Sequence, residues 1–294
     1  SYYKEGANTD LWFARCANVA CTSVATRALV TSAGIIGNYN DIVIASDGYA
    51  LVAYYNQHNA MLEIAHCSDR DCINPVTVSI IDAGPLIAYS PTGGPDPSIT
   101  LGADGLALVA YMYYNPSSGS GPDLKVAYCM NIPCSTSILT QLITVWPDGF
   151  QPSITTGVDA LGLIVYWDMD YQTLNTVHCG DVLCSTMAGP QAIHNLFVGN
   201  ITPQPMVTIG AAGLGVITFY DIIGGNQNQV VAHCNDLLCS SVTEQTWISS
   251  VSPPAITISP TGNPLLTSPG VGVGGPLQVI LCQDPFCAAY FRRR

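Results

Sequence analysis

Short apolar runs separated by polar turns alternate along the whole chain, and residues 97–134 give the clearest example. Within that stretch Asp104-Gly105 is a two-residue turn signal, and a loop rich in Pro, Gly and Ser covers 115–122. No segment keeps an apolar spacing of i, i+3 and i+4, so the pattern predicts strands and no helices. The stretch therefore reads as three strands and the start of a fourth: 98–101, 106–113, 124–129 and the segment that begins at Cys134.

The same unit recurs along the chain in register. It returns at 41–72, 152–184 and 205–239, in a degenerate copy at 254–287, and in an N-terminal piece that matches only the later part of the unit. A period near fifty with four strands per period is typical of a β-propeller. The sequence predicts an all-β, six-bladed β-propeller in a single domain, 1–294, with blades at about 1–32, 39–82, 97–145, 151–195, 202–250 and 254–291.

The first blade is predicted to be incomplete. When the repeats are aligned on their cysteines, residues 1–3 fall opposite Val52 to Tyr54, in the second strand of the next repeat. The innermost strand of the first blade is therefore missing from the sequence. An open strand edge is a template for strand addition. We expect self-association, or another extracellular chain, to complete this blade.

Twelve cysteines form six C-x4-C pairs, one in each repeat, and each pair flanks a predicted hairpin turn. Zinc is the competing interpretation, but a zinc site needs four ligands in one place, whereas these pairs belong to different blades. We therefore predict one disulfide per blade, joining the third and fourth strands. The pairs are Cys16/Cys21, Cys67/Cys72, Cys129/Cys134, Cys179/Cys184, Cys234/Cys239 and Cys282/Cys287.

Two segments carry a resemblance to a known class of repeat. SYYKEGANTDLWFARC at the N-terminus and DLKVAYC at 123–129 resemble the cysteine-paired propeller repeats of secreted and surface proteins, mostly bacterial. The resemblance implies an extracellular propeller and carries no common catalytic motif. The last repeat departs from it, because Leu281 replaces the histidine before the first cysteine.

Composition and charge exclude several functions. Charged residues make up only 10% of the chain and the net charge is −12, so the basic face that nucleic-acid binding needs is missing. No apolar run approaches the length of a membrane span. Six predicted disulfides place the protein in an oxidising compartment, so we expect it to be extracellular or at the cell surface.

Candidate catalytic residues are few. Glycoside hydrolysis needs two carboxylates, and propeller enzymes commonly carry them on or before the innermost strands, where this chain has Asp41 and Asp96. These two acids could approach one another, but we interpret them as strand-initiating residues. A sialidase would also need an arginine cluster for its substrate's carboxylate. We expect no catalytic residues, no metal and no cofactor.

The histidines recur at one repeat position. His66, His178 and His233 each precede the first cysteine of a repeat, and we interpret them as structural strand residues rather than metal ligands. His58 and His194 are predicted to be loop or edge residues without a partner.

Aromatic residues gather in the predicted loops between second and third strands, where rings could stack on sugars. The candidates for this ligand face are Tyr55, Tyr114, Trp167, Tyr171 and Tyr220. One glycosylation signal, at Asn200, lies between two blades.

We expect a structural or adhesive surface component, in the form of a repeating filament subunit, and not an enzyme. The alternative is a lectin-like propeller with glycan partners, and a propeller hydrolase or lyase is the third hypothesis.

Overall fold

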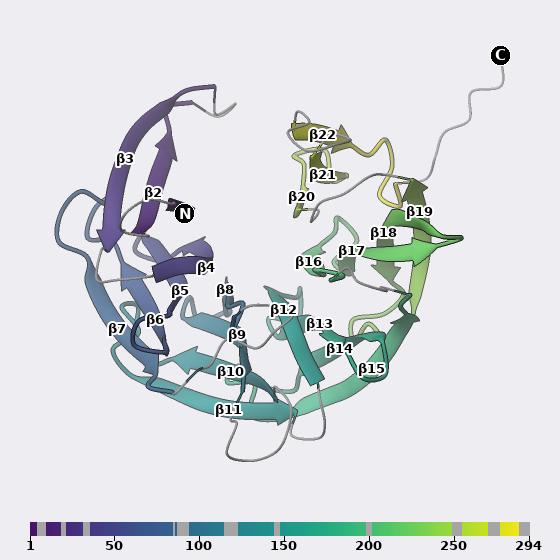
Figure 1. Cartoon of the computed structure of the whole chain (residues 1–294), viewed down its shortest axis with the longest axis horizontal. Helices are drawn as coiled ribbons and strands as arrows, with labels where there is room; N and C mark the ends of the chain where they lie inside the picture. The colour runs from purple at the N-terminus through teal and green to yellow at the C-terminus, as the bar shows by residue number, and fades with distance from the viewer. Residues whose placement is uncertain are drawn as a thin grey trace. The chain divides into compact units, whose positions relative to one another are not determined.

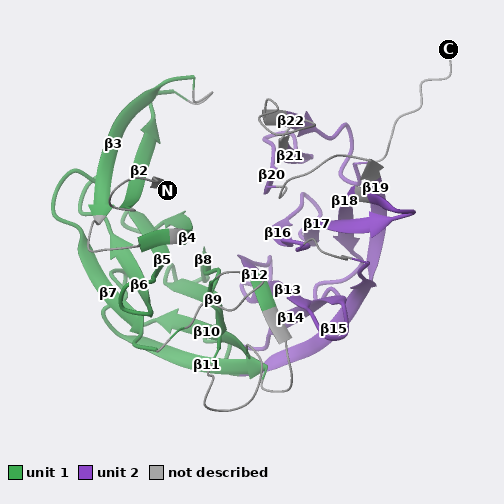
Figure 2. Ribbon diagram, viewed as in Figure 1, with its two compact units in different colours: residues 1–152, 182–185 green, residues 153–181, 186–294 purple. Residues whose placement is uncertain are grey.

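The computed structural model describes most of the chain. The described residues are 1–4, 10–18, 22–31, 36–84, 86, 94–114, 123–143, 148–197, 202–248, 255–269 and 277–287. They fall into two compact units (Figure 2), residues 1–152 with 182–185 and residues 153–181 with 186–294. Each unit is described by itself below.

The first unit contains three antiparallel sheets (Figure 1). The first sheet has three strands in the order β1-β2-β3, and the second and third sheets have four strands each in sequence order. The strands are β1 (Tyr2–Lys4), β2 (Asp10–Cys16), β3 (Val24–Thr31), β4 (Ile36–Ile44), β5 (Ala50–Asn56), β6 (Met61–His66), β7 (Thr77–Asp82), β8 (Ser98–Leu101), β9 (Ala107–Tyr113), β10 (Asp123–Cys129) and β11 (Ser137–Ile143).

The later sheets repeat this pattern. The fourth sheet is β12-β13-β14-β15, the fifth is β16-β17-β18-β19, and the described part of the sixth is β20-β21-β22. The strands are β12 (Asp148–Thr156), β13 (Gly162–Asp168), β14 (Thr173–Cys179), β15 (Met187–Asn195), β16 (Met206–Ile209), β17 (Gly215–Ile223), β18 (Asn226–Cys234), β19 (Val242–Ile248), β20 (Ala255–Ile258), β21 (Pro264–Pro269) and β22 (Leu277–Leu281). Neighbouring strands within each sheet are consecutive in the chain, so every connection is a simple hairpin.

The core lies between the faces of adjacent sheets. One cluster joins the second and third sheets through residues such as Leu62, Ile64 and Val109, and another joins the first and second sheets through Leu11 and Val52. The middle strands β5, β13 and β14 are buried at every position, whereas the outer strand β15 has no fully buried residue. Burial on both faces explains why the second strands are continuous apolar runs rather than alternating ones.

The all-β, propeller-like fold is confirmed, and the described residues contain no helix. The first sheet has three strands and starts at the second strand of the repeat, as predicted. Five of the described sheets, the second to the sixth, begin with the first strand of their repeat. The expected fourth strand of the last blade lies outside the described residues.

The predicted disulfides are present wherever both cysteines are described. Four have Cα–Cα distances of 4.7–4.9 Å: Cys67–Cys72, Cys129–Cys134, Cys234–Cys239 and Cys282–Cys287. Cys16, Cys179 and Cys184 are also disulfide-bonded, and Cys21 lies outside the described residues. The predicted position of the second cysteine was wrong. In the four repeats whose second cysteine and fourth strand are both described, this cysteine lies in the turn, three or more residues before the fourth strand, so the bond joins the end of the third strand to the turn.

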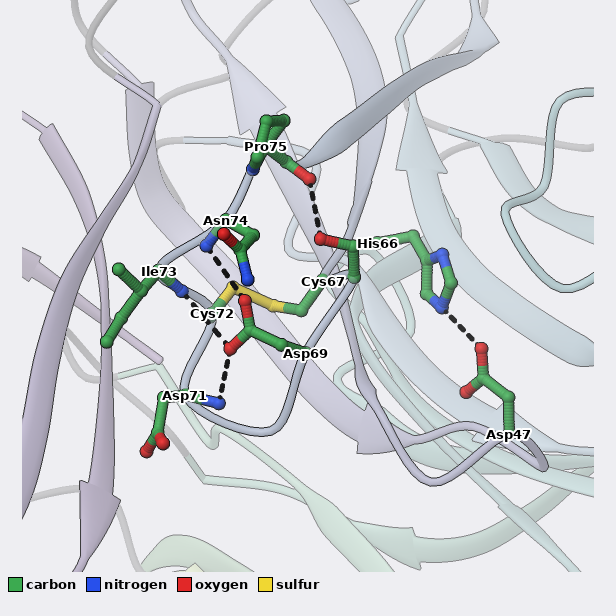
Figure 3. Close-up of a disulfide and its surroundings, with 10 residues drawn as sticks. Asp47, His66, Cys67, Asp69, Asp71, Cys72, Ile73, Asn74 and Pro75 are labelled. Atoms are coloured by element: carbon green, nitrogen blue, oxygen red, sulfur yellow. Dashed lines mark hydrogen bonds and ion pairs between the residues drawn. A yellow bond between two sulfur atoms is a disulfide. The ribbon is translucent and has the colours of Figure 1, made fainter.

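A side chain inside each cysteine loop explains this geometry. In Figure 3, the Asp69 carboxylate accepts hydrogen bonds from the backbone N–H groups of Asp71, Ile73 and Asn74. The second cysteine, Cys72, has a positive φ of 54°, and its N–H donates to the Asp69 carbonyl. The same loop position holds Asn or Asp in all six repeats: Asn18, Asp69, Asn131, Asp181, Asp236 and Asp284. The sequence motif is therefore C-x-[D/N]-x-x-C, a local turn signal that C-x4-C spacing alone does not express.

Candidate functional site

Asp41 ties together the first strands of two neighbouring sheets. It lies inside β4, which is adjacent to β8. Its Oδ2 accepts hydrogen bonds from the Ser98 hydroxyl at 3.1 Å and the Ile99 N–H at 2.9 Å, and its Oδ1 accepts from the Ile42 N–H at 2.8 Å. Burial raises the pKa of Asp41, and these three hydrogen bonds oppose that rise. Asp41 thus links β4 to β8 by hydrogen bonds.

Asp41 lies inside β4 and does not initiate the strand, which corrects the sequence-based interpretation, and Asp96 holds a different position in the repeat. Asp41 pairs with Ala53 in the second sheet, just as Ser98 pairs with Ala110 in the third, so Asp41 and Ser98 share a repeat position. Ser153 shows what this position does elsewhere, because its hydroxyl accepts a hydrogen bond from the Val207 N–H at 3.1 Å. Asp96 lies two residues earlier in the repeat.

Asp96 is the most unusual carboxyl group among the described residues. It has a positive φ of 43° and stands between Pro95 and Pro97, two residues before β8. Its Oδ2 is buried, and no residue in the described part of the chain hydrogen-bonds to it. Burial raises the pKa of Asp96 to about 8, so the group is protonated at neutral pH.

Aromatic groups and a glycine surround Asp96. The charge of Asp96 contributes to the raised pKa of Tyr39, behind the larger effect of burial, and Tyr55 contributes as well. A Cβ atom on Gly94 would lie 2.4 Å from the ring carbons of Tyr39, so only glycine fits beside that ring. The chain around Asp96 is therefore fixed by close packing.

The backbone conformation of Asp96 belongs to the repeat, whereas its carboxyl group does not. Gln151 and Gln204 occupy the same position before a proline, with φ values of 51° and 44°. Positive φ is uncommon for residues other than glycine and costs conformational energy. Three repeats share this conformation, but only Asp96 adds an acid to it. A buried, protonated carboxyl with an unsatisfied oxygen can donate a proton to a bound group.

The predicted aromatic ligand face does not assemble as expected. Tyr55, Trp167 and Tyr220 are buried, and the Tyr55 hydroxyl donates to the Leu86 carbonyl at 2.7 Å. Tyr114 is half-buried, and Tyr171 is 74% exposed. Three of the five rings therefore pack inside the blades, and Tyr171 alone is open enough to stack on a sugar. Asn200 lies outside the described residues.

The pre-cysteine residues have a structural role that depends on the turn acid of their own repeat. His66 Nε2 lies 2.9 Å from Asp47 Oδ2, as Figure 3 shows, and His178 Nε2 lies 3.0 Å from Asp159 Oδ2. Tyr128, at the same position, donates to Asp104 at 2.6 Å. Each pair connects the end of the third strand to the first hairpin turn, so these histidines are engaged inside their own blade.

His194 is not an unpartnered edge residue, which corrects the sequence-based prediction. It lies in β15, with Nδ1 2.7 Å from Glu244 Oε1 and Nε2 3.0 Å from Asp221 Oδ2. Burial lowers the pKa of His194, but the hydrogen bonds to both carboxylates outweigh it and raise the pKa to about 9. The Phe219 ring packs on the imidazole at 4.8 Å. His194 therefore forms ion pairs that link β15 to β17 and β19.

The first unit has an equivalent contact with the charges exchanged. Asp82, at the end of outer strand β7, accepts a hydrogen bond from the Tyr111 hydroxyl at 2.7 Å and lies 3.3 Å from Lys125 Nζ. Lys125 also lies over the Tyr113 ring at 3.4 Å. Here the outer strand supplies the acid and the next sheet the base, the reverse of the His194 arrangement. Both are contacts between neighbouring sheets.

No group of three or more His, Cys, Asp or Glu side chains in the described residues could hold a metal ion. Nor do the described residues include a helix long and apolar enough to cross a membrane.

Comparison with known proteins supports the fold and gives no family. No family model matches the chain, and no curated protein matches it either. Solved structures do. A protein of unknown function from Dyadobacter fermentans has a TM-score of 0.58 at 14% identity, over 83% of this chain and 78% of its own. A Penicillium chrysogenum α-L-arabinanase complexed with arabinobiose has a TM-score of 0.56 at 15% identity, over 82% and 77%.

A third structure, the Hadza microbial sialidase Hz136, has a TM-score of 0.55 at 13% identity, over 83% of this chain and 59% of its own. Likeness at these identities shows the fold. It nevertheless contradicts two predictions made from the sequence, that the propeller is a structural or adhesive component and that it is not an enzyme. The similar structures include named enzymes, an arabinanase and a sialidase. The cysteine repeat predicted the propeller fold but carried no information about a catalytic or binding site.

Proposed function

We propose that this chain is an extracellular carbohydrate-active propeller that hydrolyses glycosidic bonds at a site around Asp96. The single observation that carries the proposal is the protonated Asp96 carboxyl, whose Oδ2 is buried and has no hydrogen-bond partner in the described residues. The likeness to an arabinanase supports a glycan as substrate class.

The chemistry of glycoside hydrolysis matches this acid. Cleavage needs one carboxylic acid that protonates the departing oxygen, and that acid must keep its proton at the working pH. Asp96 meets this condition because burial raises its pKa to about 8. Asp41 is a candidate for the second carboxylate, since its Oδ2 accepts a hydrogen bond from the N–H of Ile99, three residues after Asp96.

The test is hydrolysis of a panel of neutral oligosaccharides and polysaccharides, arabinan included, by the wild type and three variants. Asp96→Asn keeps the size of the side chain and removes the proton, so we expect activity to fall by about 100-fold or more. Asp41→Asn removes the negative charge of a side chain that also links β4 to β8. The stability of this variant must therefore be measured together with its activity. Asp170→Asn, an exposed acid in the turn between β13 and β14, is the matched control and should keep full activity.

A glycan-binding propeller without turnover is the second candidate. This candidate is favoured by Asp41, because three donors occupy its two carboxylate oxygens and it is therefore less suited to act as the second catalytic carboxylate. A glycan array distinguishes the two. Binding that survives in Asp96→Asn, without hydrolysis by the wild type, would support binding alone and overturn the hydrolytic proposal.

A further inference from the structure

Three repeats place an acid against the residue that precedes the first cysteine. His66 contacts Asp47, Tyr128 contacts Asp104 and His178 contacts Asp159, at distances of 2.6–3.0 Å. In both histidine pairs the atom in contact is Nε2. The repeat therefore contains a fixed slot for one carboxylate, between the first hairpin turn and the end of the third strand.

The fifth sheet keeps the histidine of this pair but lacks the acid. Its turn reads Gly210-Ala211-Ala212-Gly213, which puts Ala212 where the other three repeats have aspartate. His233, at the end of β18, is 8% exposed, and its Nε2 is buried without a hydrogen-bond partner in the described structure. A buried polar group left unpaired costs free energy, so this histidine is the exception that needs an explanation.

A cavity occupies the place of the missing acid. It has a volume of about 150 Å³ and is lined by Ala212 and His233 together with apolar residues, among them Ile258, Pro264 and Phe286. The Phe286 ring packs on the imidazole at 4.7 Å and is itself half exposed, so it stands between the histidine and solvent. An apolar cavity of about this volume can hold a molecule as large as benzene.

We propose that this cavity is a binding site for a small aliphatic monocarboxylate of acetate size, whose carboxylate takes the place of the missing aspartate on His233. The repeat supplies the geometry, since His66 and His178 bind a carboxylate through the same ring nitrogen. The apolar lining suits the short alkyl group of such an acid. His233 is the one polar side chain among the lining residues, so it is the side chain to which the carboxylate would bind.

Binding should be coupled to proton uptake. Burial lowers the pKa of His233, and the charge of Asp284, in the cysteine loop that follows β22, partly opposes this effect. Asp284 is the one charged group that acts on His233 in the described residues, and the lining contains no other titratable side chain. A bound carboxylate favours the imidazolium, so affinity should rise as the pH falls toward the free-state pKa of His233.

The experiment is a titration of the whole protein with sodium acetate, followed by the NMR signals of the histidine rings. We expect a saturable shift of the His233 signal, with an increase in its pKa, and little change at the other four histidines. Acetamide has the same shape without the charge, and chloride supplies the charge without the shape, so both should bind at least about tenfold more weakly.

Ala212→Asp supplies the missing acid from the chain itself. It should raise the His233 pKa without added acetate, and abolish the acetate-dependent shift. The matched control is Ala103→Asp, which adds the same charge to the turn of a repeat whose slot already holds Asp104, and which should leave acetate binding unchanged. An equal response to acetate and acetamide, no saturable response at all, or acetate binding that persists in Ala212→Asp would overturn the proposal. Activity toward glycans does not enter this test, so it is independent of the hydrolytic proposal.

Discussion

At the residue scale, His194 carries a positive charge that two carboxylates share in the second unit. It places one imidazolium between two carboxylates, and Asp221 has almost no exposed surface. Asp221 also accepts hydrogen bonds from the N–H groups of Phe197 and Ile222, and its pKa is lowered despite burial. Loss of the histidine would leave a buried carboxylate without its counter-charge, which is costly.

We therefore predict that His194→Gln lowers the free energy of unfolding by about 2 kcal/mol at pH 6. The folded pKa of His194, about 9, lies above the ordinary value of 6.5, so its contribution is complete below pH 6.5 and is lost as the pH rises through 9. Urea unfolding of both proteins between pH 5 and pH 10 measures this difference. The exposed His58→Gln is the control and should match the wild type throughout. A His194→Gln deficit that stays constant to pH 10 would contradict the assignment.

At the element scale, the cysteine loop is a turn held by a side chain as well as by a disulfide. Asp69 binds three backbone N–H groups that would otherwise have no partner in the turn, and these bonds lower its pKa. Two other repeats use asparagine here, and the Asn131 side-chain oxygen accepts the Ser135 N–H in the same way. The loop requires an acceptor, not a charge.

The need for an acceptor at Asp69 can be tested by comparing two variants of this residue. Asp69→Ala should lower the Tm measurably because the turn loses its acceptor, whereas Asp69→Asn should remain close to the wild type because Asn keeps one. Thermal unfolding followed by circular dichroism, with the disulfides intact, measures both. Equal losses in the two variants would show that the charge of Asp69 matters rather than its hydrogen bonds.

The sequence predicts elements better than contacts between them. Hairpin turns and the cysteine period locate the strands, because both are local signals. The partners of His194 are 27 and 50 residues away and belong to a neighbouring sheet, so no local pattern connects them. Asp41 was expected to initiate a strand, whereas β4 extends back to Ile36 and places Asp41 inside the strand. The loop acid of C-x-[D/N]-x-x-C, by contrast, was visible in the sequence.

At the scale of the whole molecule, the disulfides are all local, and that determines how they stabilise the fold. Each described bond closes a loop between residues five apart, so the chain-entropy model gives about 2 kcal/mol for each. Repeat proteins derive their stability from individual repeats and from the contacts between neighbours. Bonds within single repeats therefore strengthen each sheet separately and do not cross-link one sheet to another. Disulfides of this number indicate an extracellular protein.

Reduction should consequently weaken the sheets one by one rather than unfold the protein in a single step. We predict that full reduction lowers the Tm and broadens the thermal transition, because each sheet loses the bond that stabilises it separately from its neighbours. Calorimetry with and without reductant, with mass spectrometry to confirm reduction, measures both effects. Removing one bond at a time, with Cys282→Ser and Cys287→Ser in one variant and Cys129→Ser and Cys134→Ser in another, should broaden the transition less than full reduction does. A reduced protein that melts as sharply as the oxidised one would show that the sheets unfold as one cooperative body, and that contacts between sheets outweigh the bonds within them.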